Sequence, residues 1–241
     1  MKASYSDQQA ILELQRLDDQ LASLAQREAT LPETVALNSA VIKRNNIRDL
    51  RIAAETERTD VRRELTRAEG DVEQIMTRIQ RDEARLNSGT GTPKELEQTQ
   101  HELVTLGLRR AELEEVELAI MVQVESISNR INELSAEEET LANEIADLEI
   151  KRENALTIII NERSAVSEKR TSIAAPIAQE LKDLYTKLAA DNNGNGAAPL
   201  VGNECKGCHL TINTTEVQRI STLPAEEVVR CEQCRCILVR E

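Results

Sequence analysis

The sequence contains no Trp and no Phe, and its aromatic side chains are limited to two Tyr. Turn formers are also scarce, with 8 Gly and 5 Pro among 241 residues. Aromatic side chains fill deep globular cores and turn formers connect the strands of large sheets, so a large α/β enzyme domain is not expected. The residues that are abundant are Leu, Ile, Val and Ala mixed with Glu, Arg and Gln, a composition typical of long helices.

Positive charge is in short supply as well. The chain has 30 Lys and Arg against 43 Asp and Glu, a net charge of -13. The whole molecule therefore should not attract nucleic acid or an anionic membrane nonspecifically, although a local basic patch can still bind. No stretch is long and apolar enough to span a membrane, and the opening MKASYSDQQA lacks the hydrophobic run of a signal peptide. We expect a cytoplasmic protein with no membrane partner.

Two polar breaks divide the chain. Residues 87–93 are turn formers that end in a helix-start signature, in which Thr92 can cap, Pro93 suits the first helical position and Glu95 completes a Thr-x-x-Glu box. Residues 191–196 form a polar stop of Asp, Asn and Gly. These breaks predict helical character for residues 4–87 and 93–190 and a separate tail beyond 200.

Hydrophobic periodicity in the helical zones is typical of a coiled coil. In the first zone, Val61, Leu65, Ala68, Val72, Ile75 and Ile79 alternate spacings of four and three. In the second zone a Leu or Ile recurs every seven residues, at Leu106, Leu113, Ile120, Ile127, Leu134, Leu141 and Leu148.

Two long helices joined by a short Gly-containing loop most simply fold back as an antiparallel hairpin. Charge supports this pairing, since residues 41–67 carry eight basic and five acidic side chains, whereas the facing residues 113–139 carry one basic and eight acidic. A parallel homodimeric coiled coil is the rival architecture, and the loop at 87–93 argues against it.

Two prolines interrupt the helical zones. Pro32 falls inside the first arm and Thr30-x-x-Glu33 reads as another helix start, so we expect a kink or break near 32. Pro176 lies where the second arm returns to the N-terminus, and it leaves residues 177–188 as a short helical continuation.

All five cysteines lie in the tail. Cys205 and Cys208 form one C-x-x-C pair, and Cys231 and Cys234 form a second pair after 22 intervening residues. Two such turns supply the tetrahedral four-sulfur shell that zinc accepts, and Gly207 suits a turn that needs unusual backbone dihedrals. We therefore predict one structural Zn²⁺ per chain. Thr214 or Thr215 can cap a short helix, and residues 228–230 and 237–239 read as short strands.

Other ligand sets remain open. Cys236 can replace Cys234, and His209 can replace Cys208, but either choice breaks the symmetric pairing. The simplest interpretation of Cys236 is an inward strand residue. Four thiolates leave zinc no open position for water, and a redox role for C-x-x-C needs a βαβ context that is absent. With only His101 and His209 available for acid-base work, we expect no enzyme and no small-molecule substrate.

The arrangement resembles a bacterial family of C4-type zinc-ribbon proteins with a long N-terminal coiled-coil hairpin. The likeness covers essentially the whole chain and is carried by Cys205-x-Gly-Cys-His209, by Cys231-x-x-Cys234 before Ile237-Leu238, and by Pro93-Lys-Glu-Leu96 after the turn. Family members commonly have Gly-Arg where this chain has Arg235-Cys236. The resemblance implies a non-enzymatic adaptor or nucleic-acid-binding role, because similar proteins have been linked to the alternative sigma factor sigma-54, flagellar gene control and transcript binding.

The expected fold is therefore mainly α: a coiled-coil helical hairpin over residues 1–190, a linker over 191–200 and a C4 zinc ribbon over 201–241. We expect the ribbon to be independent, so that loss of zinc unfolds the tail alone. The leading function is a binding protein whose ribbon contacts nucleic acid or a transcription component such as a sigma factor. The alternative is a protein-protein scaffold that uses the acidic arm or the hairpin tip.

Each of these two functions implies its own set of residues that would contact the partner. Lys206 and Arg235, one beside each cysteine turn, are the candidates for contacting nucleic acid or a partner. The tail from residue 200 has five basic and six acidic side chains, so its charge does not favour nucleic acid. Residues 94–153 carry 16 acidic and six basic side chains, which suits a basic protein partner. Lys94, Glu95 and Glu102 are the candidate contacts at the hairpin tip.

Overall fold

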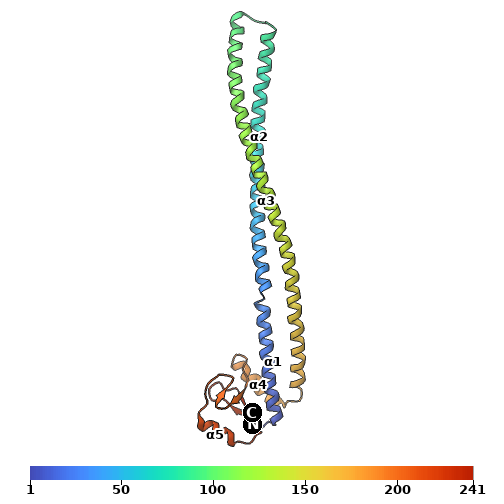
Figure 1. Ribbon diagram of the computed structural model, residues 1–241, viewed down its shortest axis with the longest axis vertical. Helices are drawn as coiled ribbons and strands as arrows, with labels where there is room; N and C mark the ends of the chain where they lie inside the picture. The colour runs from blue at the N-terminus through green and yellow to red at the C-terminus, as the bar shows by residue number, and fades with distance from the viewer. Residues whose placement is uncertain (241) are drawn as a thin grey trace. The chain divides into compact units, whose positions relative to one another are not determined.

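A computed structural model describes residues 1–240 of the chain and divides it into two compact units (Figure 1). The hairpin unit is Ala36–Leu148, and the sheet unit combines Met1–Val35 with the chain from Glu149 onward. The helices are α1 (Tyr5–Ala29), α2 (Pro32–Asn87), α3 (Pro93–Ala174), α4 (Gln179–Asp191) and α5 (Thr214–Thr222). The strands are β1 (Ala197–Val201), β2 (Glu204–Cys205), β3 (Val229–Arg230) and β4 (Ile237–Arg240).

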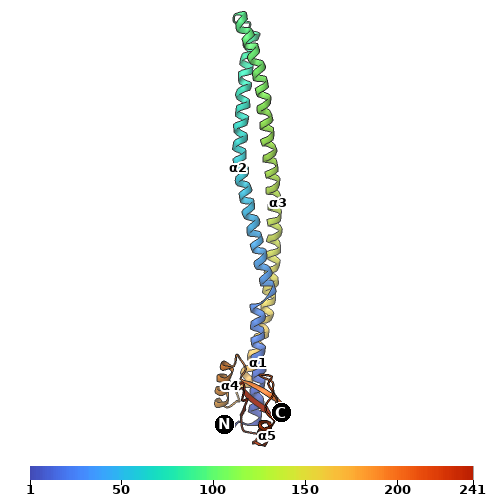
Figure 2. The same ribbon diagram turned by 90° about the vertical axis from the view of Figure 1, so that its left-hand side faces the viewer.

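The hairpin unit is an antiparallel pair of helices from one chain, which confirms the predicted fold class (Figure 2). Across the pair, Arg51 Nε donates to Glu138 Oε2 at 2.8 Å, and Arg78 forms an ion pair with Glu102. The predicted heptad residues are the buried side of α3. Leu106, Ile131 and Ile145 are buried, and Leu113, Ile120, Ile127, Leu134, Leu141 and Leu148 are half-buried. Among the described residues, no helix is both long and apolar enough to cross a bilayer.

The turn between α2 and α3 has the predicted capping box. The backbone N–H of Thr92 donates to Glu95 Oε2 at 2.7 Å, and the backbone N–H of Glu95 returns a bond to Thr92 Oγ1 at 3.4 Å. Gly89 and Gly91, with φ of 64° and 146°, supply backbone conformations that other residues rarely adopt. The turn therefore begins α3 at Pro93, as its residues predict.

Both prolines interrupt the helices. At Pro32 the interruption is complete, because α1 ends at Ala29 and α2 begins at Pro32. Thr30 Oγ1 donates to the carbonyl of Gln26 at 2.8 Å, so this hydroxyl closes α1 rather than opening α2 as the capping pattern predicted. At Pro176 the chain leaves α3 and resumes as α4, whose inward residues Leu181 and Leu188 are buried.

The four strands form one sheet in the order β2-β1-β4-β3, with β1 and β4 parallel and the other pairs antiparallel. Alternate residues of β4 face opposite sides. Ile237 and Val239 join a core with α1 and α4, whereas Leu238 joins a second core that includes Ile220 of α5 and the cysteines. The sheet is therefore covered on one face by the chain's first helix and on the other by its last.

The structure corrects the predicted linker and the predicted independence of the tail. Residues 197–201 are β1, a central strand hydrogen-bonded along its length to β4. Gln15 of α1 binds the preceding turn: its Oε1 accepts the N–H groups of Gly196 at 2.7 Å and Ala197 at 3.1 Å, and its Nε2 donates to the Gly194 carbonyl at 2.9 Å. The sheet and α1 share one core, so we expect them to fold together.

The first three residues also belong to this assembly. The Ala3 N–H donates to the Glu226 carbonyl at 2.8 Å, and the Val228 N–H donates to the Met1 carbonyl at 3.1 Å. Gln8, which is 2% exposed, donates to the carbonyls of Ala3 and Ala225. The N-terminus is thereby joined to the segment that precedes β3.

Candidate metal centre

The two C-x-x-C turns have the same backbone geometry. In the first, the N–H of His209 donates to the Cys205 carbonyl at 2.7 Å, and in the second the N–H of Arg235 donates to the Cys231 carbonyl at 3.0 Å. His209 and Arg235 both lie in the left-handed region, with φ of 59° and 66°. Each turn follows a two-residue strand, β2 or β3, so the sheet positions the turns toward one another.

Backbone N–H groups favour the thiolate form in both turns. The backbone N–H groups of Cys208 and Gly207 act to lower the pKa of Cys205, and those of Cys234 and Gln233 act to lower the pKa of Cys231. Burial acts more strongly, so it raises the pKa of Cys205 to about 12 and also raises that of Cys231. A coordinated metal ion reverses the effect of burial, because coordination deprotonates a thiol.

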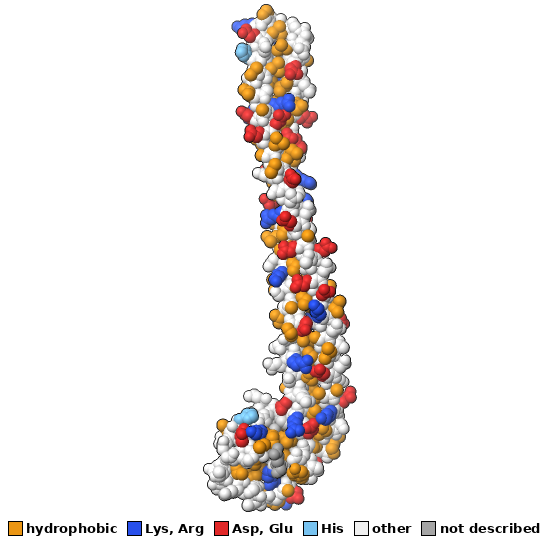
Figure 3. Space-filling view, in the orientation of Figure 1, with side chains coloured by type: hydrophobic (Ala, Val, Ile, Leu, Met, Phe, Trp, Pro, Cys, Tyr) orange, Lys and Arg blue, Asp and Glu red, His pale blue; other side chains and the backbone are white. Residues whose placement is uncertain are grey.

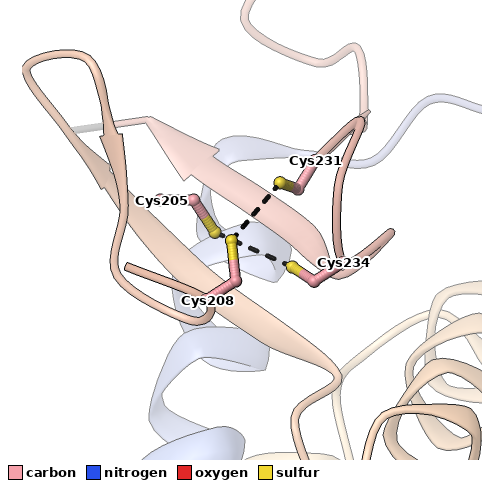
Figure 4. A group of neighbouring side chains, drawn as sticks. All are labelled: Cys205, Cys208, Cys231 and Cys234. Carbon is pink, nitrogen blue, oxygen red and sulfur yellow. Dashed lines mark hydrogen bonds between the residues drawn. The ribbon is translucent and has the colours of Figure 1, made fainter. Parts of the chain in front are cut away.

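The four sulfurs of these turns converge, as Figure 4 shows. They all lie within 4.8 Å of one another, and the Cys205–Cys234 and Cys208–Cys231 Sγ distances are both 3.9 Å. Tetrahedral zinc with Zn–S bonds of about 2.3 Å places its sulfurs about 3.8 Å apart. Cys205 and Cys231 are buried, whereas Cys208 and Cys234 are half-buried. The structure thus brings the four predicted ligands together at distances that fit a metal ion.

Gly207 is needed for a different reason from the one predicted. It does not adopt a left-handed conformation; His209 does. A Cβ at residue 207 would lie 2.6 Å from Asn195 Nδ2 and 2.9 Å from the Ala198 Cβ, so a larger residue does not fit. Asn195 Nδ2 also donates to the Gly207 carbonyl at 2.8 Å, which fixes the first turn against the residues before β1.

The two alternative ligands have different surroundings. His209 has a 74% exposed side chain, and its Nδ1 lies 3.4 Å from Glu204 Oε1. Cys236 is fully buried, with its Sγ 3.3 Å from that of Cys234 and 3.7 Å from that of Cys205. Burial, followed by contact with Cys234, raises the pKa of the Cys236 thiol. Cys236 is the inward residue predicted, and it lies directly beside two of the four converging thiols.

The other predicted site residues form separate contacts. Lys206 Nζ donates to Glu204 Oε2 at 2.7 Å, which lowers the pKa of Glu204. Arg235 is exposed, and its carbonyl accepts from Arg230 Nε at 3.1 Å. At the tip, Lys94 is exposed, Glu95 belongs to the capping box and Glu102 pairs with Arg78. Thr92, through its N–H and then its hydroxyl, holds the pKa of Glu95 below its usual value.

The sheet is supported by a polar group that the sequence pattern does not reveal. Tyr185 Oη donates to Asp18 Oδ2 at 2.7 Å, and Arg170 donates to the same oxygen at 3.0 Å, so α1, α3 and α4 are joined through one carboxylate. Gln15 was missed for the same reason. A polar residue on an amphipathic helix is ordinarily assigned to the solvent-facing side. When its hydrogen-bond partner lies far away in the sequence, no local pattern indicates that it is buried.

A coiled-coil helical hairpin followed by a small sheet with four converging cysteines defines the class of protein to which this chain belongs. Residues 14–193 match the family described as the CT398-like coiled coil hairpin domain, and the chain belongs to that family. The match covers most of both helical zones, so the hairpin expected from the resemblance is confirmed.

Relatives and solved structures agree with this assignment. The chain is 33% identical over its whole length to "Uncharacterized protein Rv2229c" of Mycobacterium tuberculosis (strain ATCC 25618 / H37Rv), covering 98% of that protein. A solved protein of Mycobacterium smegmatis has 30% identity and a TM-score of 0.87, with 100% of each chain covered. CT398 of Chlamydia trachomatis has 19% identity and a TM-score of 0.72, with 98% of each chain covered. The last likeness is one of fold.

Proposed function

We propose that the four-cysteine centre binds one Zn²⁺ with a structural role. The support is the donor set and the spacing: four thiols lie at about the separation that tetrahedral zinc requires, on two turns whose backbone N–H groups act to lower the pKa of Cys205 and Cys231. A metal held by four thiolates has no open position for water. We therefore propose a non-enzymatic protein, in the cytoplasm, where thiols stay reduced.

We further propose that the protein is an adaptor whose hairpin unit binds a helical protein partner. The observation that carries this proposal is a second apolar stripe on α3. Val104 and Leu108 are followed two heptads later by Leu118 and Val122, with Ala111 and Glu115 at the positions between them. The four large apolar side chains are 63%, 67%, 61% and 66% exposed. At 3.6 residues per turn they lie about half a turn from the buried seam that contains Leu106. A third helix can cover such a stripe in the way that α2 covers the seam.

The charges beside this outer stripe indicate what the partner is like. Glu112, Glu115 and Glu125 are exposed along the same stretch. The local cations Arg109 and Arg110 are already paired within α3, with Glu112 at 2.8 Å and Glu114 at 2.7 Å. Two copies of this stripe would bring acidic side chains together, so a helix with basic flanks fits better. Figure 3 shows hydrophobic side chains reaching the surface among acidic ones along the helices.

A transcription component such as a sigma factor is the partner class that the motif resemblance implies, and it is part of this proposal. Nucleic acid is a second candidate at the sheet unit. It is favoured by the adjacency of Arg230 and Arg235 at the second cysteine turn, where both cations lie at the surface or partly exposed. It is disfavoured by Lys206, whose charge is already compensated by Glu204.

Affinity capture with the full-length protein separates these candidates. The Leu108→Glu/Val122→Glu variant changes the outer stripe, Ile42→Glu is a matched control at a 61% exposed position of α2, and Arg230→Glu/Arg235→Glu changes the sheet unit. The adaptor proposal expects a protein that survives nuclease treatment, binds again as a purified component and is lost in the stripe variant alone. Partners lost on nuclease treatment or in the arginine variant would overturn it in favour of nucleic acid.

A further inference from the structure

The fifth cysteine occupies a defined position relative to the second turn. Cys236 follows Cys234 by two residues, and the left-handed conformation of Arg235 between them brings their sulfurs within 3.3 Å. Its sulfur also lies 3.7 Å from that of Cys205, a distance shorter than the 3.9 Å between Cys205 and Cys234. Cys236 is therefore as close to two ligands as those ligands are to each other.

Packing alone does not account for a thiol at this position. Cys236 is fully buried in the core formed by Ala198, Leu238 and Ile220, where an apolar side chain of similar size would fill the space. The polar contacts recorded for its Sγ are the sulfurs of Cys205 and Cys234. The thiol thus faces the metal centre from the interior side, whereas Cys234 itself is half-buried and open to solvent.

The first turn provides an internal comparison. The N–H of Cys231 donates to the carbonyl of Cys236 at 3.0 Å, and the equivalent N–H of Cys205 donates to the carbonyl of Leu210 at 3.1 Å. Leu210 is thus the backbone counterpart of Cys236, but it is 51% exposed and has no sulfur. The two half-buried ligands therefore differ: Cys234 lies beside a thiol outside the set of four, whereas the thiol beside Cys208 is that of Cys231, another of the four.

We propose that Cys236 is a reserve ligand: when the Cys234 thiolate is lost, the Cys236 thiolate takes its coordination position and the metal stays bound. This inference rests on the proposed zinc centre. The exchange needs no oxidant, because Cys236 releases one proton to solvent as its sulfur replaces that of Cys234 on the ion. A change of χ1 rotamer moves a cysteine sulfur by about 2.9 Å. That distance is most of the 3.3 Å that separates the sulfurs of Cys236 and Cys234.

The test is cobalt substitution in the full-length protein, because thiolate-to-cobalt charge-transfer absorbance counts the bound thiolates. Wild type and Cys236→Ala should give the same absorbance and one ion per chain. Cys208→Ser should lose about a quarter of the absorbance, since three of four thiolates remain. Cys234→Ser should keep the full absorbance, and Cys234→Ser/Cys236→Ala should lose that quarter again. Equal losses in Cys234→Ser and Cys208→Ser would overturn the reserve role.

A second measurement covers variants that do not fold. Wild-type protein loaded with zinc is treated briefly with iodoacetamide and examined by native mass spectrometry with peptide mapping. The fraction of chains that retain zinc should be higher among those alkylated once at Cys234 than among those alkylated once at Cys208, because only the former have a substitute thiolate. Equal zinc loss from both forms would contradict the proposal. A wild type that takes up neither cobalt nor zinc would overturn the metal centre itself, an outcome distinct from failure of Cys236 alone.

Discussion

The hairpin unit and the sheet unit are stabilised in different ways. In the hairpin unit, one turn brings two helices together and the seam repeats, so most seam residues, such as Leu113 and Ile120, are half-buried. In the sheet unit, the fully buried Ile11, Leu181 and Ile237 come from the beginning and the end of the chain. Contacts in the first unit are spread over many half-buried residues, whereas those in the second are concentrated in a few fully buried residues and, under our proposal, in the zinc centre.

The largest effect that separates the two units should come from metal removal. Chelation of wild type removes a contribution of about 10–16 kcal/mol in comparable structural zinc sites, and Cys205→Ser removes part of it. Because α1 and α4 share a core with the sheet, hydrogen exchange should accelerate in residues 197–240 and also in α1. Residues 36–148 should keep their protection. Unchanged exchange in α1 would restore the independent tail that the sequence alone predicted.

A cavity in the shared core should have the next largest effect. Leu181 is 0% exposed, so Leu181→Ala should lower the free energy of unfolding of the sheet unit by about 2–5 kcal/mol. Leu113→Ala in the half-buried seam is the matched control and should cost less. Both Tyr residues lie in the sheet unit, so tyrosine fluorescence reports that unit while circular dichroism reports all helices. Leu181→Ala should shift the fluorescence transition in urea more than the dichroism transition; equal shifts would contradict the comparison.

The hydrogen bonds of Gln15 should contribute less to the free energy of unfolding than the burial of Leu181 does. Gln15→Ala leaves the buried N–H groups of Gly196 and Ala197 without their acceptor, at a cost of about 1–3 kcal/mol. Gln15→Glu keeps an acceptor oxygen but loses the bonds from Nε2 to the Gly194 carbonyl and to Asp19 Oδ1, and it places a second carboxylate beside Asp19, so its urea midpoint should also fall below that of wild type. A Gln15→Ala midpoint equal to that of wild type would show that the turn before β1 does not need α1.

The smallest expected effect is a pH dependence confined to the sheet unit. Burial first, and then the bond to Asp18, raise the pKa of Tyr185 above its unfolded value of about 10. The contribution of Tyr185 to the free energy of unfolding is therefore fully present below about pH 10. It is lost as the pH rises further, because this phenol ionises at a lower pH in the unfolded chain than in the folded one. Tyr185→Phe should remove this alkaline loss in urea titrations. Tyr5→Phe, at a 55% exposed position, should not.

The periodic parts of the molecule could be predicted from sequence because their contacts follow from local spacing. The heptads, the box at Thr92 and Glu95 and the break at Pro32 are of this kind. The four converging cysteines follow equally from the paired motifs. The strand Ala197–Val201 could not be predicted, since its small residues and Pro199 resemble a linker and its order comes from parallel pairing with β4. Long-range pairing leaves no local pattern.

The contact between the first residues and the segment before β3 also sets an order of events during synthesis. Ala3 and Glu226 are joined by a hydrogen bond, so synthesis must reach residue 226 before Ala3 has its partner. The hairpin residues 36–148 emerge earlier and contain all the contacts of their own seam. Folding should therefore begin in the middle of the chain. The apolar face of α1 should stay exposed until the strands that pack against it have been synthesised.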